Sequence, residues 1–334
     1  MKIIITGVLG QDGILLARNL LKRGVEVFGI CKTIPEDKLA DITRDLDGLK
    51  LIEADVSEYG AILSAVTNIE PDVIFNFAGK TSVGLSWKNP RDYINVNTIG
   101  CVNCLEAIRE SNLECKFFQA GSAQQFGGTR THPLSEKDSF FPENPYAVSK
   151  VLAHEITCHY REHLGVHATN VILFAHESSL RSTAFLSKKI SLGVAEIAIG
   201  TRDRISVGNM SVIRDWGYAP DYVNFMADLI LLDRGRDIVL ATGRGHSVGD
   251  MIEFAFAGAG IKLTWEGEGK SRIGVDQNGI VRVDVDSEFY RSDDQPYLVG
   301  NPTKASELIE WSPSMDLQEM MKLLVELEIQ KIEQ

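Results

Sequence analysis

The sequence predicts an α/β fold in which a Rossmann-type, doubly wound parallel sheet precedes a smaller, irregular α/β domain. In the first half of the chain, short apolar runs alternate with longer segments whose apolar residues recur at helical spacing. A glycine-rich turn joins the first apolar run to the first helical segment, and the regular alternation ends after about residue 175. Alternating strands and helices build right-handed βαβ units, so helices cover both faces of the resulting parallel sheet.

The expected elements of the first half follow one another closely. Short apolar runs bounded by turn residues predict strands at 2–5, 25–30, 49–52, 73–77, 115–120 and 166–174. Helical spacing predicts helices at 14–23, 58–68, 98–111 and 146–163. Gly24 is expected to end the first helix, because glycine readily adopts the left-handed conformation found there. We therefore expect a Rossmann domain at 1–175 and a second domain at 176–334, some segments of which return to the first.

Composition and charge exclude several classes of protein. The 334-residue chain carries a net charge of −12, and an acidic surface repels phosphate backbones, so a nucleic acid polymer is not an expected partner. No apolar run approaches the roughly 18–20 residues that a membrane span needs, and the N-terminal apolar run is too short for a signal peptide. The five scattered cysteines favour buried, reduced thiols over a metal site. We expect a soluble cytoplasmic protein.

The turn after the first strand carries Gly7, Gly10 and Gly13 in a G-x-x-G-x-x-G pattern that also contains Gln11 and Asp12. Glycines let the backbone turn tightly and approach a pyrophosphate closely, and the following helix offers N–H groups and its positive dipole end to that anion. The same glycines would suit a tight turn that binds nothing. Their position inside the first βαβ unit favours a dinucleotide site.

The residue that ends the second strand usually selects between NAD and NADP. A carboxylate there would bind the adenosine ribose of NAD, but this strand ends without one, and Lys32 could bind the 2′-phosphate of NADP. Lys32 could equally be a solvated loop lysine. We therefore expect NADP, with NAD left open. The adenine edge is expected near Asp55 and Val56, and the expected pyrophosphate and ribose contacts are Phe77, Ala78 and Lys80.

Tyr146 and Lys150 form a Tyr-x-x-x-Lys pair whose side chains share one face of the predicted helix. A phenol titrates near pH 10, and a neighbouring ammonium brings its pKa into the working range of a base. The lysine can also hold the nicotinamide ribose. Ser122 follows the strand that precedes this helix, where its hydroxyl could bond the reacting oxygen. The pair therefore predicts hydride transfer with a nicotinamide cofactor.

At this point the chain resembles the extended short-chain dehydrogenases/reductases, and specifically the GDP-mannose 4,6-dehydratase family. The similarity runs nearly end to end, and the Gln-Asp-Gly ending of the glycine turn is more specific than its glycines. Family-like stretches lie at 118–120, 145–148, 172–174, 176–178, 208–210, 214–217, 241–243, 246–248 and 302–305.

The resemblance implies a GDP-sugar substrate, so residues 176–334 are expected mainly to bind the nucleotide sugar. Family members oxidise C4 of a GDP-hexose with NADP, eliminate water across C5 and C6, and return the hydride to C6. By position, Ser122 matches the family's catalytic Thr, while Tyr146 and Lys150 match its base and lysine. The resemblance places substrate contacts at Ser82, Ser122, Lys189, Asn209, Arg214, Arg291 and Asp294.

Departures from the family pattern fall on residues with assigned roles. Gln124 stands where the family has the Glu that removes the C5 proton, and an amide cannot accept that proton. Ala175 stands where the family has an Asn, and Thr183 stands where the family has an acidic residue that contacts guanine. In the family, a Pro-Arg-Arg-Gly-Glu loop reaches the cofactor of a neighbouring subunit. At the same place, residues 179–183 of this chain read Ser-Leu-Arg-Ser-Thr. We therefore expect a homodimer and leave a tetramer open.

Three functions remain open. Because the oxidation residues are present and the elimination base is not, we favour a 4-dehydrogenase, 4-keto reductase or 4-epimerase of a GDP-hexose or GDP-heptose. The second is a dehydratase with another base, for which the nearest titratable residues in sequence are His132, Glu136, Asp138 and His176. The third is a catalytically poor protein that binds the cofactor. Gln124 is thus included among the catalytic positions.

Overall fold

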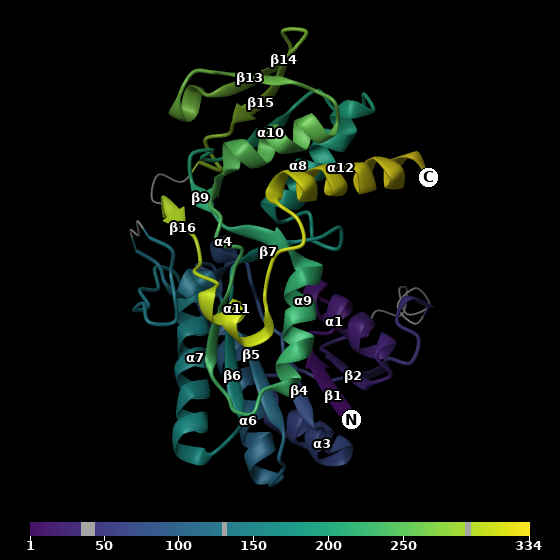
Figure 1. The fold of residues 1–334 in the computed structure, drawn as a ribbon, viewed down its shortest axis with the longest axis vertical. Coiled ribbons are helices and arrows are strands. Elements are labelled where there is room, and N and C mark those ends of the chain that lie inside the picture. The colour runs from purple at the N-terminus through teal and green to yellow at the C-terminus, as the bar shows by residue number, and fades with distance from the viewer. Residues whose placement is uncertain (35–43, 129–131, 291–294) are drawn as a thin grey trace.

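A computed structural model describes residues 1–34, 44–128, 132–290 and 295–334 (Figure 1). Its central feature is a seven-stranded parallel sheet in the order β11-β6-β5-β4-β1-β2-β3. The strands are β1 Lys2–Thr6, β2 Glu26–Cys31, β3 Lys50–Glu53, β4 Val73–Asn76, β5 Lys116–Ala120, β6 Ala168–Leu173 and β11 Asp237–Leu240. The predicted Rossmann-type sheet is confirmed.

Both faces of this sheet are covered because successive side chains of a strand point to opposite sides. Ile3 and Ile5 belong to one core cluster, and Ile4 belongs to another. The first cluster contains side chains of α1 Gln11–Lys22, α9 Ala219–Asp228 and α11 Thr303–Ile309. The second contains side chains of α3 Tyr59–Ile69, α6 Gly100–Glu110 and α7 Pro145–Leu164. The sheet is therefore the middle of three layers.

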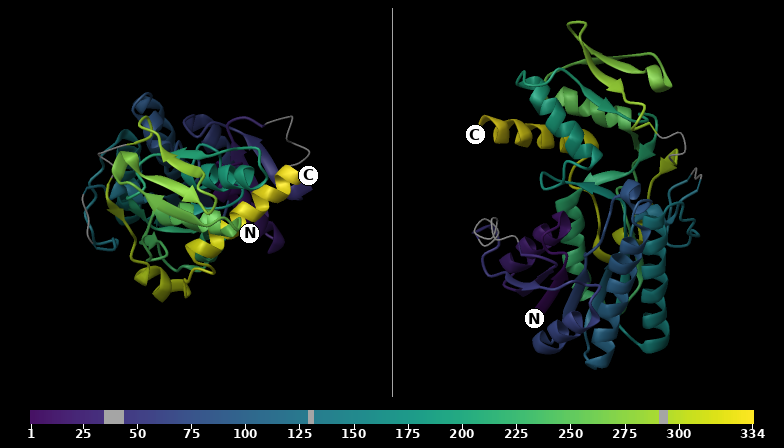
Figure 2. Two further views of the ribbon diagram at one scale, coloured as in Figure 1. Left: turned by 90° about the horizontal axis from the view of Figure 1, so that it is seen from above. Right: turned by 180° about the vertical axis from the view of Figure 1, so that it is seen from behind.

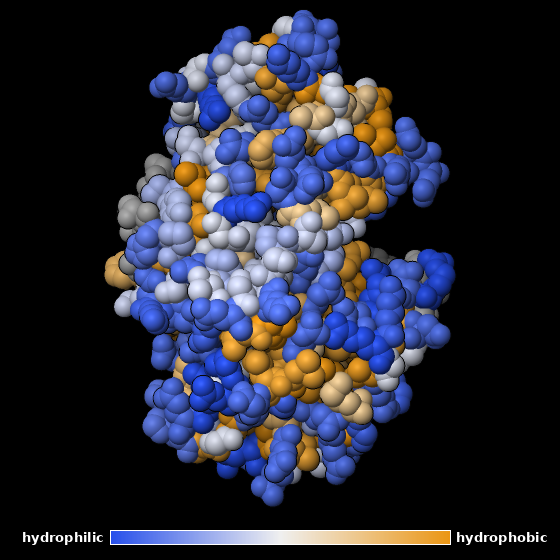
Figure 3. Space-filling model, in the orientation of Figure 1, coloured by the Kyte–Doolittle hydropathy of each residue, from blue (hydrophilic) through white to orange (hydrophobic). Residues whose placement is uncertain are grey.

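The second half of the chain forms a smaller α/β unit above the carboxyl ends of these strands (Figures 1 and 2). Helices α8 Leu186–Ala198, α10 Val248–Gly258 and α12 Leu317–Glu333 share one apolar cluster. A four-stranded sheet lies beside them, in the order β13 Leu263–Glu266, β14 Ile273–Asp276, β15 Val281–Val285 and β8 Ile205–Val207. Figure 3 shows a recess between this unit and the lower one, on the side where α12 lies above α1.

The chain passes between the two units several times. The edge strand β11 and helix α9 come from the second half of the sequence but pack in the first unit. Small sheets lie between the units: β7 Ala175–Glu177 with β10 Trp216–Tyr218, and β12 His246–Ser247 with β9 Ile213–Arg214 and β16 Tyr297–Leu298. No helix in the part of the chain that the structure describes is long and apolar enough to cross a bilayer.

The helix expected at 98–111 differs from the prediction at its N-terminal end. A π-helical segment, η2 Ile94–Ile99, precedes α6 and follows α5 Pro90–Tyr93. Asn97 lies in this segment, where its side chain accepts a hydrogen bond from the Lys80 N–H at 2.8 Å and donates to the Ser149 hydroxyl at 2.8 Å. Such π-helical turns are rare and often occur at functional sites.

Candidate active site

A cavity of about 390 Å³ opens at the carboxyl ends of β1, β4, β5 and β6, below the smaller unit. We call it the catalytic cavity. Ligands of doubly wound sheets bind in crevices at this end of the strands. Nine of the residues singled out from the sequence line it: Asp12, Phe77, Ser122, Gln124, Tyr146, Lys150, Ala175, His176 and Arg214.

The floor of the catalytic cavity is fixed by a buried row of polar side chains at the ends of the three central strands. The Thr6 hydroxyl donates to Asn76 Oδ1 at 2.6 Å, and Asn76 Nδ2 donates to Gln119 Oε1 at 2.7 Å. Thr6 Oγ1 also accepts from the Ala78 N–H at 3.1 Å. Because buried polar groups are costly when unpaired, this row holds β1, β4 and β5 in one register under the site.

Tyr146 enters the catalytic cavity from the first turn of α7. Asn144 caps that helix by accepting from the Ala147 N–H at 2.9 Å, and Pro145 has the fixed φ that suits a first helical residue. Burial raises the pKa of Tyr146, while a hydrogen bond with Ser122 and the charge of Arg181 act in the opposite direction. The lowering of this pKa by Lys150 that the sequence suggested stays a prediction.

Ser122 is positioned by the short helix η3 Ala123–Gln125. Its hydroxyl accepts from the Gln124 N–H at 3.3 Å, and Gln125 Oε1 accepts from the Ser122 N–H at 2.6 Å, which together form a capping box. This capping box fixes the backbone around Ser122. Because the Ser122 oxygen is an acceptor in the box, its hydroxyl proton remains available for donation to another group. Gln124 lines the same wall of the catalytic cavity.

Lys150 lies one turn beyond Tyr146 and is buried. Burial lowers the pKa of its ammonium to about 8. Its Nζ donates to the Ala120 carbonyl at 2.8 Å, which is its one hydrogen bond among the described residues. A Cβ added to Gly79 would lie 3.6 Å from this Nζ, so the backbone there passes close to it. An ammonium with spare donors in this position fits the hydroxyls of a nicotinamide ribose.

The glycine loop, residues 7–13, has the geometry that a dinucleotide diphosphate requires. Gly7 has a φ of +66°, and an added Cβ would lie 2.7 Å from the Ala78 nitrogen. A Cβ added to Gly13 would lie 2.6 Å from the Val8 Cα. Gly10 is the N-cap of α1, and no side chain caps that end. The first N–H groups of α1 therefore fit an anionic ligand.

The loop is tied to β7 by the side chains of Asp12 and Gln11. His176 Nε2 lies 3.0 Å from Asp12 Oδ1, and Gln11 Nε2 donates to the His176 carbonyl at 3.1 Å. Burial opposes ionisation of Asp12, but the charge and hydrogen bond of His176 lower its pKa to about 2. Burial acts against the imidazolium, yet Asp12 raises the pKa of His176. The buried pair therefore fastens the glycine loop to β7.

The other expected cofactor contacts lie along the same edge of the sheet. Lys32 is exposed, and its Nζ lies 2.7 Å from Asp55 Oδ2. Val56 is buried in the core next to Gly100. Lys80 pairs with Asp92 at 2.9 Å. Lys32 and Asp55 thus lie side by side where the adenosine end of a dinucleotide is expected.

We expect the protein to bind NADPH more tightly than NADH, by about tenfold, because Lys32 can donate to a 2′-phosphate. Asp55 should reduce the preference for NADPH, since its carboxylate competes with the 2′-phosphate for the Lys32 ammonium. Calorimetric titration with both cofactors measures the ratio. Lys32→Ala should bring it close to one, whereas Lys50→Ala, which removes another exposed, carboxylate-paired lysine, should leave it unchanged. A preference for NADH in the native protein would contradict this role of Lys32.

The expected substrate contacts are dispersed. Arg214 lines the catalytic cavity, and its guanidinium donates to the carbonyls of Ile213 and Gln295 at 2.8 and 2.7 Å. Lys189 does not line the cavity, and its Nζ lies 3.7 Å from the ring centroid of Phe289. Ser82 and Asn209 each accept a local backbone hydrogen bond, from Leu85 and Ser211. Arg291 and Asp294 lie outside the described residues.

Sequence reasoning missed three residues that shape the site. Asn97 supports Gly79 and Lys80 from the π-helical segment, and the apolar periodicity of a helix carries no signal for it. Glu177 and Arg181 line the catalytic cavity from β7 and the loop that follows. Arg181 could have been noticed as the one cation kept in the altered 179–183 loop, although nothing in the sequence shows which way it points.

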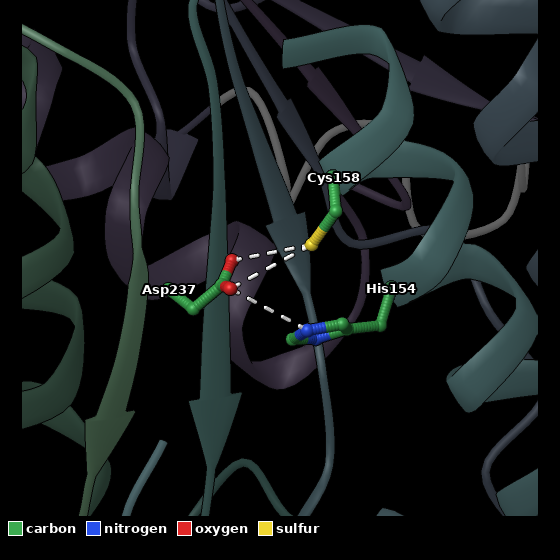
Figure 4. A group of neighbouring side chains, drawn as sticks. All are labelled: His154, Cys158 and Asp237. Carbon is green, nitrogen blue, oxygen red and sulfur yellow. Dashed lines mark hydrogen bonds and ion pairs between the residues drawn. The ribbon is translucent and has the colours of Figure 1, made fainter. Parts of the chain in front are cut away.

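A second polar cluster lies away from the catalytic cavity, between α7 and the start of β11 (Figure 4). His154 Nε2 lies 3.6 Å from Asp237 Oδ2, and Cys158 Sγ lies 3.6 Å from the same oxygen. Arg161 Nη1 already donates to Asp237 Oδ1 at 2.9 Å, and Asn170 Nδ2 donates to the same oxygen at 2.9 Å. These donors neutralise the carboxylate, so the cluster fastens β11 to α7.

Comparisons with known proteins agree with this geometry. A family model described as GDP-mannose 4,6 dehydratase matches residues 4–324. The chain belongs to the GDP-mannose 4,6-dehydratase family. It is 35% identical to GDP-mannose 4,6 dehydratase 2 of Caenorhabditis elegans, over 99% of this chain and 89% of that one. It is also 35% identical to GDP-mannose 4,6-dehydratase of Vibrio cholerae, over 97% of this chain and 92% of that one.

Solved structures share the fold of this GDP-mannose 4,6-dehydratase family member. UDP-glucose 4-epimerase of Thermus thermophilus, in complex with NAD, superposes with a TM-score of 0.81 at 20% identity, covering 98% of this chain and 99% of that one. This likeness shows that the two proteins share a fold. The chain is an NAD(P)-dependent enzyme that modifies a nucleotide sugar.

Proposed function

We propose that the enzyme transfers a hydride at C4 of a GDP-hexose or GDP-heptose, as a 4-dehydrogenase, 4-keto reductase or 4-epimerase, with NADP. In the oxidative direction, Tyr146 accepts the proton of the C4 hydroxyl while the bond between C4 and its hydrogen breaks. When bound, the nicotinamide supplies the hydride acceptor. Ser122 orients the reacting oxygen and Lys150 holds the ribose. The observation that carries the proposal is the absence of a free carboxylate among the described residues of the catalytic cavity.

Each described carboxylate that lines the catalytic cavity is engaged by the protein. Asp12 is paired with His176. Glu177 Oε2 accepts from the Ser187 hydroxyl at 2.6 Å and lies 3.0 Å from Arg181 Nε. Asp215 accepts from Thr242 and from the Gly243 N–H at 2.6 to 2.9 Å. A carboxylate whose charge is shared with such donors is a weaker acceptor for a C5 proton than a free one.

The other bases considered for elimination are also committed elsewhere. His132 and Asp138 pair with each other at 2.9 Å, and Glu136 Oε1 accepts from the Val239 N–H at 2.6 Å. None of these three lines the catalytic cavity. His176 does line it, but its Nδ1 contacts the Phe174 carbonyl at 2.7 Å while its Nε2 contacts Asp12. These pairings of the four alternative bases support the proposal that the enzyme does not remove the C5 proton.

A 4,6-dehydratase is the second candidate, and the family assignment favours it. It needs a C5 base that the described residues do not provide in free form.

For assembly we propose a homodimer, supported by Val148 and Leu152. These two residues lie one turn apart on α7 with relative exposures of 38% and 41%. A tetramer stays open.

The product formed in D2O from a GDP-hexose or GDP-heptose separates the two candidates. The proposal predicts a 4-keto, epimerised or reduced sugar that keeps its C6 oxygen and carries no deuterium at C5. The reason is that general-base help is typically worth about 10²–10⁴-fold, and an amide supplies none. Mass spectrometry reads both the loss of water and the deuterium. A 4-keto-6-deoxy product formed at enzymatic rates would return the enzyme to the dehydratases.

Gln124→Glu provides the complementary variant. Adding a carboxylate at this wall of the catalytic cavity should introduce C5 exchange and some elimination. Asn144→Asp makes the same amide-to-acid change at the cap of α7, outside the cavity, and should leave the product unchanged. Equal products from native protein and Gln124→Glu would mean that C5 lies out of reach of this position.

A further inference from the structure

The last two turns of α7 carry a pair of exposed histidines. His159 and His163 are the one pair of histidines in the chain that a single turn of one helix relates, since α7 spans Pro145–Leu164. Both side chains are exposed. Side chains four residues apart lie one above the other on the same side of a helix. The pair therefore offers two imidazoles to one ligand.

The two imidazole rings already lie face to face. Their centroids are 5.4 Å apart, and their planes are inclined by 21°. Within the described part of the chain, neither ring makes a hydrogen bond or an ion pair. A zinc ion held by both rings would need each ligating nitrogen at about 2.0–2.1 Å. Because the χ2 torsion of histidine is broad and exposed side chains reorient readily, both nitrogens can turn towards one ion while the backbone stays in place.

The surroundings of the histidine pair favour a cation. Glu162 is exposed and lies one helical turn from His159 on the neighbouring row of side chains. His163 belongs to the last turn of α7, where the free carbonyls and the helix dipole favour positive charge. Arg161 is the nearest cation in sequence, but its guanidinium donates to Asp237 at 2.9 Å and lies 3.9 Å from the Glu162 carboxylate.

The buried cluster of His154, Cys158 and Asp237 is less suited to an ion, although it also lies on α7 (Figure 4). Arg161 and Asn170 both donate to its carboxylate at 2.9 Å. Burial raises the pKa of the Cys158 thiol to about 12, whereas a metal binds the thiolate. An ion in the buried cluster would have to displace a guanidinium, while an ion at the exposed pair displaces only solvent.

We infer that His159 and His163 chelate a transition-metal ion of the zinc class. Imidazole nitrogens suit Zn²⁺, Ni²⁺ and Cu²⁺, whereas Mg²⁺ and Ca²⁺ prefer oxygen ligands. Water or the Glu162 carboxylate completes the coordination of the ion. The pair lies about 20 Å along α7 from Tyr146, so the ion clips the end of the helix and takes no part in hydride transfer. The inference is independent of the product formed at C4.

Calorimetric titration of the protein with Zn²⁺, without a histidine tag, tests the inference. The native chain should bind one saturable equivalent, and His159→Gln and His163→Gln should each lose it, because one imidazole cannot chelate. Zn²⁺ should also raise the unfolding temperature of the native protein by a few degrees, but not that of either variant. His132→Gln changes an exposed histidine outside α7 and should keep the site. Mg²⁺ should not compete for it.

Two further measurements locate the ion. Electron paramagnetic resonance of bound Cu²⁺ should show two imidazole nitrogens as ligands. Cys158→Ser should bind Zn²⁺ as the native protein does. Binding that is lost in Cys158→Ser but kept in His159→Gln would place the ion in the buried cluster, and one equivalent for every two chains would place it between copies. Either result overturns the inference, as does equal Zn²⁺ binding by the native protein and both glutamine variants of the pair.

Discussion

Tyr146→Phe is expected to reduce hydride transfer by about 10²–10⁴-fold while leaving cofactor affinity nearly unchanged. Only the hydroxyl to which we assign proton exchange with the substrate is lost, because phenylalanine fills nearly the same buried volume beside Ser122. Formation of reduced cofactor, followed by absorbance with a GDP-sugar, measures the rate, and calorimetry measures the affinity. Lys150→Ala should impair both, since we expect that ammonium also to hold the ribose.

Tyr93→Phe is a matched control for this variant. Tyr93 is a buried tyrosine whose ring centroid lies 6.3 Å from that of Tyr146, and its hydroxyl donates to the Ser82 carbonyl at 2.6 Å. Loss of this hydroxyl should lower stability by about 0.5–1.5 kcal/mol and leave turnover largely intact. Near-native turnover in Tyr146→Phe would remove the proposed role of Tyr146.

Gly10→Asp is expected to abolish dinucleotide binding without harming the fold. Gly10 has the extended backbone of an N-cap, with φ −76° and ψ 167°, and the neighbour nearest to an added Cβ is the Gly7 carbonyl at 3.2 Å. Aspartate is a favoured N-cap residue, so its carboxylate should occupy the N–H groups of α1 and stabilise the helix by about a few tenths of a kcal/mol relative to glycine. The same carboxylate repels a diphosphate.

The measurement pairs a thermal unfolding curve with a titration of NADPH. Gly10→Asp should unfold at the same or a higher temperature than the native protein and show no cofactor binding. Gly10→Ala adds a Cβ without charge or cap, so it should retain most of the affinity. Retained binding by a stable Gly10→Asp protein would show that the diphosphate does not lie at this helix terminus.

The sequence predicted the parts of the fold that depend on local patterns. The glycine loop follows β1 directly, and the apolar runs at residues 2–5 and 73–77 match β1 and β4 closely. Tyr146 and Lys150 could be paired because a helix turn relates them, and both line the catalytic cavity. Each of these signals lies within a few residues of the feature it predicts.

Contacts between distant segments could not be predicted in the same way. Asp12 and His176 are 164 residues apart, and neither type of side chain signals its partner. Lys189 was assigned by resemblance, yet its Nζ lies over the ring of Phe289 outside the lining of the catalytic cavity. The π-helical segment around Asn97 was missed because a one-residue insertion in the helical turn leaves the apolar spacing almost unchanged.

The position of β11 in the sequence affects how the sheet forms during synthesis of the protein. Its neighbour β6 ends at Leu173, so about sixty residues must leave the ribosome before the sheet acquires its last strand at Asp237–Leu240. Until then β6 exposes an unpaired edge, and the sheet face that α9 covers lacks Tyr222 and Phe225. Tyr146 and Lys150 are therefore synthesised well before the scaffold that positions them is complete. Completion of the sheet therefore depends on residues of the second half, and a fragment ending near residue 175 would carry Tyr146 and Lys150 on a sheet that lacks its edge strand.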